Sequence, residues 1–149
     1  MSAVPPLLSV IVASFNTGRY LDACLDSVAA QTFRPLEVIV YDDASTDRSP
    51  DIIRRWERSF PAWCRGIFAR ENRGVAHARQ QAILASAGEY ITTLDSDDYF
   101  GDAGKLEAEM GLILSRRTSS GEDVIAFSDV LRVDENGAPL RLWSRDGNL

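Results

Sequence analysis

Short apolar runs alternate along the chain with longer stretches whose apolar side chains recur at three- and four-residue spacing. The short runs are rich in β-branched residues and indicate buried strands, whereas the longer stretches are typical of amphipathic helices. We predict strands at residues 7–13, 36–41, 65–70, 90–94 and 123–133. We predict helices at residues 18–31, 75–87 and 103–116, and one that begins at Ser49-Pro50, with Ser49 or Asp47 as the capping residue.

The strand–helix–strand order indicates a parallel sheet, because parallel neighbours need a crossover connection. We expect an α/β fold with a mostly parallel sheet and helices on both faces, similar to a Rossmann fold, in a single domain over residues 1–149. Residues 118–122 indicate a polar loop, and Glu135-Asn136-Gly137 a turn after the last strand. Such sheets bind ligands at the carboxyl ends of their strands.

Composition narrows the function classes. The 149 residues include 22 acidic and 16 basic side chains, for a formal net charge of −6, which excludes a fold-wide basic surface for nucleic acid. No apolar run reaches the ~20 residues of a membrane span, and residues 1–6 lack the layout of a signal peptide. Cys24 and Cys64 lie in apolar stretches without metal-ligand spacing, so we expect small core residues. A cytoplasmic protein, or one peripheral to the inner face of a membrane, is expected.

Three polar motifs directly follow predicted strands, and a parallel sheet brings all three to one edge. They are Ser14-Phe15-Asn16, Asp42-Asp43-Ala44-Ser45 and Asp95-Ser96-Asp97-Asp98. Acidic residues that converge on one edge repel one another, and such clusters usually bind a cation or accept hydrogen bonds from a ligand. The alternative is that the acids simply end strands in solvated loops.

The Asp95-Ser96-Asp97 motif predicts a divalent metal site. In extended backbone, residues i and i+2 point the same way, so both carboxylates face one ligand. Carboxylate oxygens suit Mg²⁺ or Mn²⁺, which fill the remaining positions with substrate phosphates and water. Neighbouring Asp42 and Asp43 point to opposite faces, so one carboxylate is expected to meet a ligand while the other orders the loop.

The Asn72–Arg79 stretch opens a helix with small residues, which allows close approach to its backbone. Arg79 and Arg73 are candidates to reach a phosphate. His77 is a candidate general base, although a lone histidine on the first turn of a helix is more often structural or solvated.

The ordered set of motifs resembles the family-2 inverting glycosyltransferases of the GT-A fold, over residues 7–137. The matching segments are Ser9–Asn16, the Tyr41–Asp47 stretch where the family usually has Val-Asp-Asp-Gly-Ser-Thr-Asp, Asn72-Arg73-Gly74 with Ala78-Arg79, and Leu94–Asp98, the family's metal-binding Asp-x-Asp. Ala44 stands where the family usually has glycine, which reduces the freedom of that loop to adopt positive φ.

The resemblance implies transfer of a sugar from a nucleoside-diphosphate sugar to an acceptor hydroxyl with inversion. Asp43 (or Asp42) would hold the nucleobase in a pocket lined by residues 13–16, Asp95 would lie near the ribose or sugar, and Asp97 would coordinate Mn²⁺ or Mg²⁺. The expected donor-site residues are Ser14, Asn16, Asp42, Asp43, Arg79, Asp95 and Ser96, with Asp97 and Asp95 as metal ligands.

The family's catalytic base and acceptor site lie well after the Asp-x-Asp motif, and neither Asp129 nor Asp134 matches the position of the base. We therefore expect the N-terminal, donor-binding part of a longer enzyme, weak or inactive alone and able to self-associate. The acceptor of the sugar can be a saccharide, a lipid or a protein, and the sequence does not distinguish these. Two other classes stay open: a non-catalytic nucleotide- or metal-binding module, and an Asp-dependent phosphatase, whose Asp-x-Asp should follow the first strand rather than the fourth.

Overall fold

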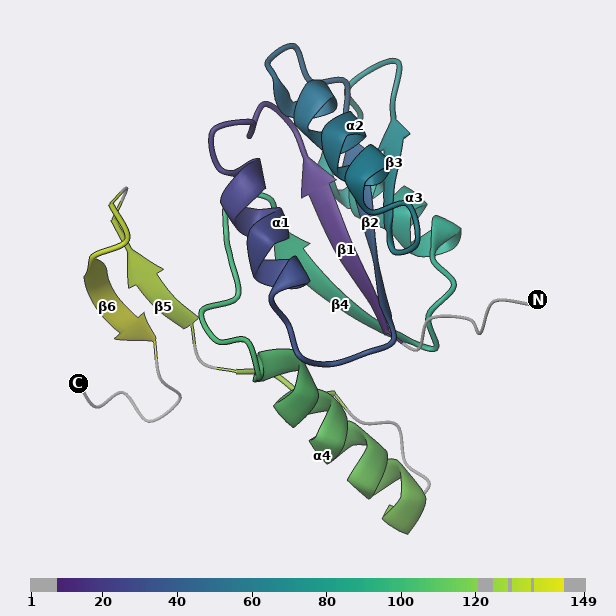
Figure 1. The fold of residues 1–149 in the computed structure, drawn as a ribbon, viewed down its shortest axis with the longest axis vertical. Helices are drawn as coiled ribbons and strands as arrows, with labels where there is room; N and C mark the ends of the chain where they lie inside the picture. The colour runs from purple at the N-terminus through teal and green to yellow at the C-terminus, as the bar shows by residue number, and fades with distance from the viewer. Residues whose placement is uncertain (1–7, 121–124, 129, 135, 144–149) are drawn as a thin grey trace. The chain divides into compact units, whose positions relative to one another are not determined.

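The computed structural model describes residues 8–120, 125–128, 130–134 and 136–143. Four strands form a parallel sheet in the order β3-β2-β1-β4, as Figure 1 shows. They are β1 (Leu8–Ser14), β2 (Leu36–Asp42), β3 (Cys64–Phe68) and β4 (Tyr90–Asp95). The helices between them are α1 (Leu21–Ala29), α2 (Ser49–Ser59) and α3 (Val75–Ala85). The predicted parallel α/β fold is confirmed.

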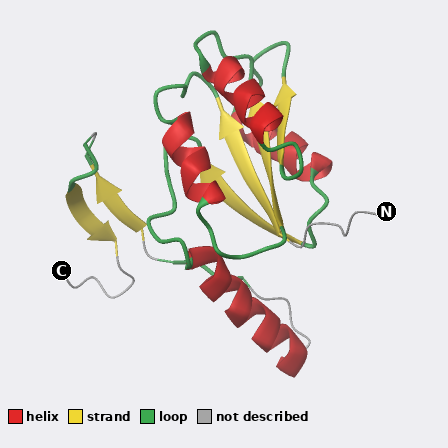
Figure 2. Ribbon diagram, in the orientation of Figure 1, coloured by secondary structure: helices red, strands yellow, loops and turns green. Residues whose placement is uncertain are grey.

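The two faces of the sheet bury alternate side chains of β1 and β2. On one face Ile11, Ile39 and Tyr41 pack against Ala78 and Ala82 of α3, whose small side chains let that helix approach the strands closely. On the other face lie four valines that are entirely buried, with α1 and α2 above them (Figures 1 and 2). These are Val10, Val12, Val38 and Val40. Helices cover both faces, as predicted.

Helix boundaries depart from prediction at two places. Helix α1 is shorter than residues 18–31, because a turn in which Tyr20 N–H donates to the Thr17 carbonyl (2.8 Å) precedes it. Neither capping candidate occupies the N-cap position of α2, which is Arg48; Ser49 is the first residue of the helix, and its N–H donates to Asp47 Oδ1 at 2.8 Å.

The region after β4 differs most from prediction. Helix α4 (Lys105–Ser120) continues through residues 118–120, which we expected in a loop, since Thr and Ser cost a helix only a few tenths of a kcal/mol each. Residues 125–128, expected in the last strand, are not extended into one. The strand there is β5 (Val130–Val133), which pairs antiparallel with β6 (Pro139–Trp143) instead of joining the parallel sheet. The Asn136-Gly137 turn, with Gly137 at φ 82°, explains this hairpin.

The chain divides into two compact units, residues 1–107 and 108–149. All of the parallel sheet and all of the predicted site residues belong to the first unit. Whether the chain acts as a single domain stays a prediction. Within the part of the chain that the structure describes, no helix is both long enough and apolar enough to span a bilayer.

Candidate functional site

The strand register brings the three polar motifs to one edge of the sheet, as predicted. Strand β1 lies between β2 and β4, with Ser14 paired to Asp42 on one side and Ala13 paired to Asp95 on the other. Acidic groups that lie more than 50 residues apart in the sequence therefore flank one central strand. Five aspartates end or follow β2 and β4 at this edge, at positions 42, 43, 95, 97 and 98.

Hydrogen bonds join the loops that follow β1 and β2 into one body. Asn16, at φ 54°, accepts the backbone N–H of Thr46 (2.8 Å) on its side-chain oxygen, and its own N–H donates to Ser45 Oγ (2.9 Å). Gly18 N–H donates to Asp47 Oδ2 at 2.9 Å, and a Cβ on Gly18 would lie 2.9 Å from that same oxygen. We predicted that Asn16 binds a ligand, but its side-chain oxygen accepts hydrogen bonds that hold the loops after β1 and β2 together.

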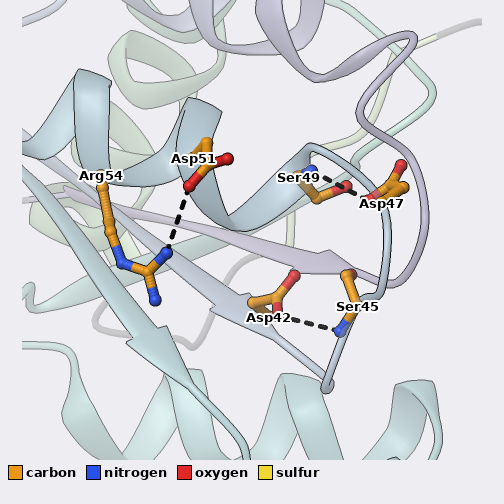
Figure 3. A network of polar contacts seen from close by, with 6 residues as sticks. All are labelled: Asp42, Ser45, Asp47, Ser49, Asp51 and Arg54. Carbon is orange, nitrogen blue, oxygen red and sulfur yellow. Dashed lines mark hydrogen bonds and ion pairs between the residues drawn. The ribbon is translucent and has the colours of Figure 1, made fainter.

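Asp42 is buried, with one hydrogen-bonded and one unpaired carboxylate oxygen (Figure 3). Its Oδ2 accepts the Ser45 N–H at 3.0 Å, while its Oδ1 is buried with no hydrogen-bond partner among the described residues. Burial raises the pKa of Asp42, and the nearby charge of Asp47 adds to the effect, although the hydrogen bonds from Ser45 oppose it. A buried acceptor without a donor is costly, so this oxygen is suited to a ligand N–H or O–H.

Asp43 is equally buried but has its partners within the chain. Its carboxylate accepts the backbone N–H of Arg73 (3.0 Å) and of Gly74 (2.7 Å), and thereby fixes the turn that enters α3. Gly74 has φ 87°, a value that favours glycine at this turn. Of the two neighbouring aspartates, Asp43 is therefore the one that orders a loop through every oxygen, and Asp42 keeps an open one.

The carboxylates after β4 are exposed and close to one another. Asp95 forms an ion pair with Arg79 of α3, Ser96 is buried, and Asp97 and Asp98 face solvent. Burial raises the pKa of Asp98, and the charges of Asp97 and Asp95 raise it further. This repulsion is what a bound cation would relieve.

These donors fit a hard divalent metal. No group of three or more His, Cys, Asp or Glu side chains among the described residues is arranged to hold an ion by itself. Mg²⁺ and Mn²⁺ sites of phosphate-binding proteins need only one or two carboxylates, with phosphate oxygens and water completing the shell. A pair such as Asp95 and Asp97 provides that number.

The remaining candidates have mainly structural surroundings. Arg79 is engaged by Asp95, and Arg73 contributes its backbone N–H to Asp43. The His77 ring meets Tyr41 edge to face at 6.1 Å between centroids, and its Nδ1 is buried without a partner among the described residues. Both cysteines are buried, as predicted, and burial raises the pKa of each thiol to about 12.

Sequence reasoning gave Ser45 no role of its own within its motif and Ser49 only a capping role, whereas both residues connect the loops of the site. Ser45 links to both Asn16 and Asp42, and Ser49 Oγ accepts the Thr17 N–H at 3.1 Å. The available signal was a run of short hydroxyl side chains immediately after buried acids, since such residues hydrogen-bond nearby backbone.

The parallel sheet with helices on both faces and acidic residues at one edge matches solved glycosyltransferases of the GT-A class over the N-terminal part of those proteins. The sequence profile described as "Glycosyl transferase family 2" matches residues 9–121. The chain belongs to this family.

Individual proteins agree with the family assignment. The chain is 37% identical over 146 residues to the uncharacterized protein Rv1520 of Mycobacterium tuberculosis, covering 93% of this chain and 41% of the relative. The mannosyltransferase PcManGT of Pyrobaculum calidifontis, solved with GDP-Man and Mn²⁺, has a TM-score of 0.66 and 31% identity over 72% of this chain and 32% of PcManGT. TarS of S. aureus (residues 1–349), solved with UDP-GlcNAc, has a TM-score of 0.68 and 29% identity, covering 74% of this chain and 32% of the TarS chain. The chain thus spans less than half of each.

Proposed function

We propose that this chain forms the donor-binding part of an inverting glycosyltransferase that uses a nucleoside-diphosphate sugar and Mn²⁺ or Mg²⁺. The observation that carries the proposal is the edge of the sheet itself. A buried carboxylate oxygen without a donor ends β2, and repelling exposed carboxylates end β4, with one strand between them. A ligand that offers N–H groups at one end and a metal-bound diphosphate at the other satisfies both.

In this proposal Asp42 receives the nucleobase through Oδ1, and Asp43 keeps the adjoining wall in place through Arg73 and Gly74. Ser14 and Asn16 line the same pocket, Ser14 through a hydroxyl that is 2.9 Å from Thr17 Oγ1. Support for these different roles comes from the hydrogen bonds, because both oxygens of Asp43 already accept backbone N–H groups, whereas Asp42 Oδ1 accepts none among the described residues.

Asp97, with Asp95, holds the metal in this proposal. When bound, the metal supplies Lewis-acid neutralisation of the departing nucleoside diphosphate. Arg79 keeps Asp95 at the edge of the sheet and adds positive charge beside the diphosphate, and the Asp98 N–H, which donates to the Asp95 carbonyl, closes the turn that carries Ser96 and Asp97.

We assign no catalytic base among the described residues. Asp134 accepts the backbone N–H of Asn136 (2.8 Å) and of Ala138 (2.9 Å), so its carboxylate holds the β5–β6 turn. Asp129 lies outside the described residues. The proposal therefore concerns donor binding first, and the acceptor hydroxyl, whether of a saccharide, a lipid or a protein, is not narrowed further.

A thermal-shift panel tests the proposal. UDP, GDP and their sugar conjugates are added at saturating concentration with Mn²⁺, with Mg²⁺, or with a chelator. A ligand at ~100 times its Kd stabilises the native state by about 2.7 kcal/mol, which for a domain of this size raises Tm by about 5–10 °C. We expect this rise with one nucleotide and metal, and a much smaller one with the chelator.

The Asp97→Asn variant should fold normally yet lose the metal-dependent part of the shift, whereas Asp26→Asn, an exposed aspartate of α1, should keep it. Equal shifts in wild type and Asp97→Asn would contradict the metal role. Activity of the full-length protein then separates the classes: sugar transfer supports the glycosyltransferase, release of phosphate from a phosphoester supports a phosphatase, and binding without turnover supports a binding module.

A further inference from the structure

One face of α1 contacts the segment that follows the Asp95-Ser96-Asp97 motif. Cys24 and Ser27 lie three residues apart on the same side of α1, and Gln31 follows two residues after the end of the helix. Cys24 Sγ donates to the Asp95 carbonyl at 3.6 Å, and Ser27 Oγ accepts the Phe100 N–H at 3.0 Å. The backbone is therefore held on both sides of Asp97, by side chains that come from a different element.

Gln31 makes the most complete set of these contacts. It is buried, its Nε2 donates to the carbonyls of Asp102 (2.8 Å) and Ser27 (3.3 Å), and its Oε1 accepts the Leu106 N–H at 3.0 Å. The next residue, Thr32, donates its backbone N–H to the Ala103 carbonyl at 2.9 Å. Both the donor and the acceptor of the Gln31 amide are therefore used to fix the path from the motif to α4.

We propose that Gln31 and Ser27 are positioning residues that set the location of the Asp97 carboxylate for the metal. The inference rests on the proposed function, since it presupposes a metal at Asp97. Asp97 is exposed and lies in a turn after the end of β4. The Asp98 N–H closes this turn by donating to the Asp95 carbonyl at 2.9 Å. Its position depends on the anchors at Asp95 and Phe100, and Gln31 supports these from the far end of the segment.

The physical consequence is a cost of ordering. If the anchors are removed, the segment samples other conformations, and the metal must order it on binding. This lowers the affinity for the metal and leaves the affinity for the nucleobase unchanged. Groups that orient a metal ligand from outside its shell typically change metal affinity by about 10–100-fold. We expect Gln31→Met, which keeps the side-chain volume, to raise the Mn²⁺ concentration at half-maximal stabilisation by about tenfold, and Ser27→Ala by less.

The experiment titrates Mn²⁺ into the 149-residue chain at saturating UDP or GDP, whichever stabilises the wild type, and follows Tm. The matched control is Glu37→Met. Glu37 accepts Ser9 Oγ (2.6 Å) and the Ala87 N–H (2.6 Å) at the opposite end of the sheet, so this variant also loses long-range hydrogen bonding but touches no part of the motif. We expect its Mn²⁺ midpoint to equal that of the wild type.

An unchanged Mn²⁺ midpoint in Gln31→Met and Ser27→Ala, with a normal metal response in the wild type, overturns the inference alone. An equal shift in Glu37→Met also overturns it, because general destabilisation would then explain the effect. Should Gln31→Met fail to fold, Ser27→Ala decides. A wild type without any metal-dependent stabilisation overturns the inference and the proposed function together.

Discussion

Two pairs of aspartates lie at the same edge of the sheet, one at the end of β2 and one at the end of β4, and their surroundings are opposite. The β2 pair, Asp42 and Asp43, is buried and receives backbone N–H groups from two loops. The β4 pair, Asp95 and Asp97, is exposed, and among the described residues it is balanced mainly by Arg79. The carboxylates of the first pair support the loops and leave one buried oxygen unpaired, whereas those of the second pair are exposed to solvent.

This difference shows which interactions stabilise the ionised carboxylates of each pair. Charge-assisted hydrogen bonds to backbone N–H groups stabilise the β2 pair before any ligand binds. The β4 pair has only a solvent-exposed ion pair and the repulsion of neighbouring acids, so it gains from a cation that the chain does not itself supply. Substitutions in the two pairs should therefore separate stability from binding.

Asp43→Ala should give the largest loss of stability. It removes the acceptor of the Arg73 and Gly74 N–H groups, and hydrogen bonds to a charged group are worth ~1.5–3 kcal/mol each, so we expect a loss of about 3 kcal/mol in the free energy of unfolding. Urea denaturation measures it. The matched change Asp97→Ala should cost less than ~0.5 kcal/mol, as exposed positions do. Similar losses in the two variants would erase the distinction between the pairs.

Arg79→Gln should have a smaller effect. The ion pair with Asp95 is partly exposed on both sides, and such pairs contribute ~0–1 kcal/mol that salt screens. We expect a loss below about 1 kcal/mol in low salt that largely disappears at ~1 M salt, measured by denaturation at both ionic strengths. A loss that persists in high salt would show that Arg79 supports the β4 pair by packing rather than by charge.

Asp98→Asn should have the smallest effect and the opposite sign. Burial and the charges of Asp97 and Asp95 raise the pKa of Asp98 above 3.8, so the folded state binds its proton more tightly than the unfolded state and stability falls as pH rises through the folded-state pKa. Neutralising Asp98 should add about 0.5 kcal/mol at pH 7, and nothing below pH 3.8.

Asp47 provides a control for that experiment, because its substitution should change the free energy of unfolding in the opposite direction. Burial opposes ionisation, but hydrogen bonds from Ser49 and the Gly18 N–H outweigh it and lower the pKa of Asp47 below 3.8. Its ionised form therefore contributes stability that is present above pH 3.8 and lost as pH falls through the lower, folded-state pKa. Asp47→Asn should accordingly destabilise at pH 7. If both variants moved stability in the same direction, the proposed environments of the two aspartates would be wrong.

The sheet and its acidic edge were predictable because local pattern determines them. Runs such as residues 36–41 are buried on both faces and must be central strands, and parallel order then fixes where their polar ends meet. The alternation of neighbouring side chains also predicted that Asp42 and Asp43 would have different roles. It did not predict which aspartate keeps the open oxygen, since that depends on the Arg73-Gly74 turn, 30 residues away.

Two features depended on tertiary contacts that no local pattern encodes. Gln31 looks like the polar end of an amphipathic helix, and only the fold brings Asp102 and Leu106 to its amide. The β5–β6 hairpin has a clear Asn-Gly turn, but an apolar run beside that turn fits a parallel strand as well as a hairpin strand. Local pattern therefore identified the chemistry of the site better than its supports.

The central place of β1 also bears on the order in which the chain folds. Leu8 pairs with Leu36, 28 positions later, and with Tyr90, 82 positions later. Loop-closure entropy makes the second pairing costlier by about 1 kcal/mol when each forms from the open chain. We therefore expect β1 and β2 to associate before β4 docks, so that the Asp42 half of the edge exists before Asp95 reaches it. Any condition that arrests folding early would leave a chain in which the proposed nucleobase site near Asp42 has formed but the proposed metal site near Asp95 has not.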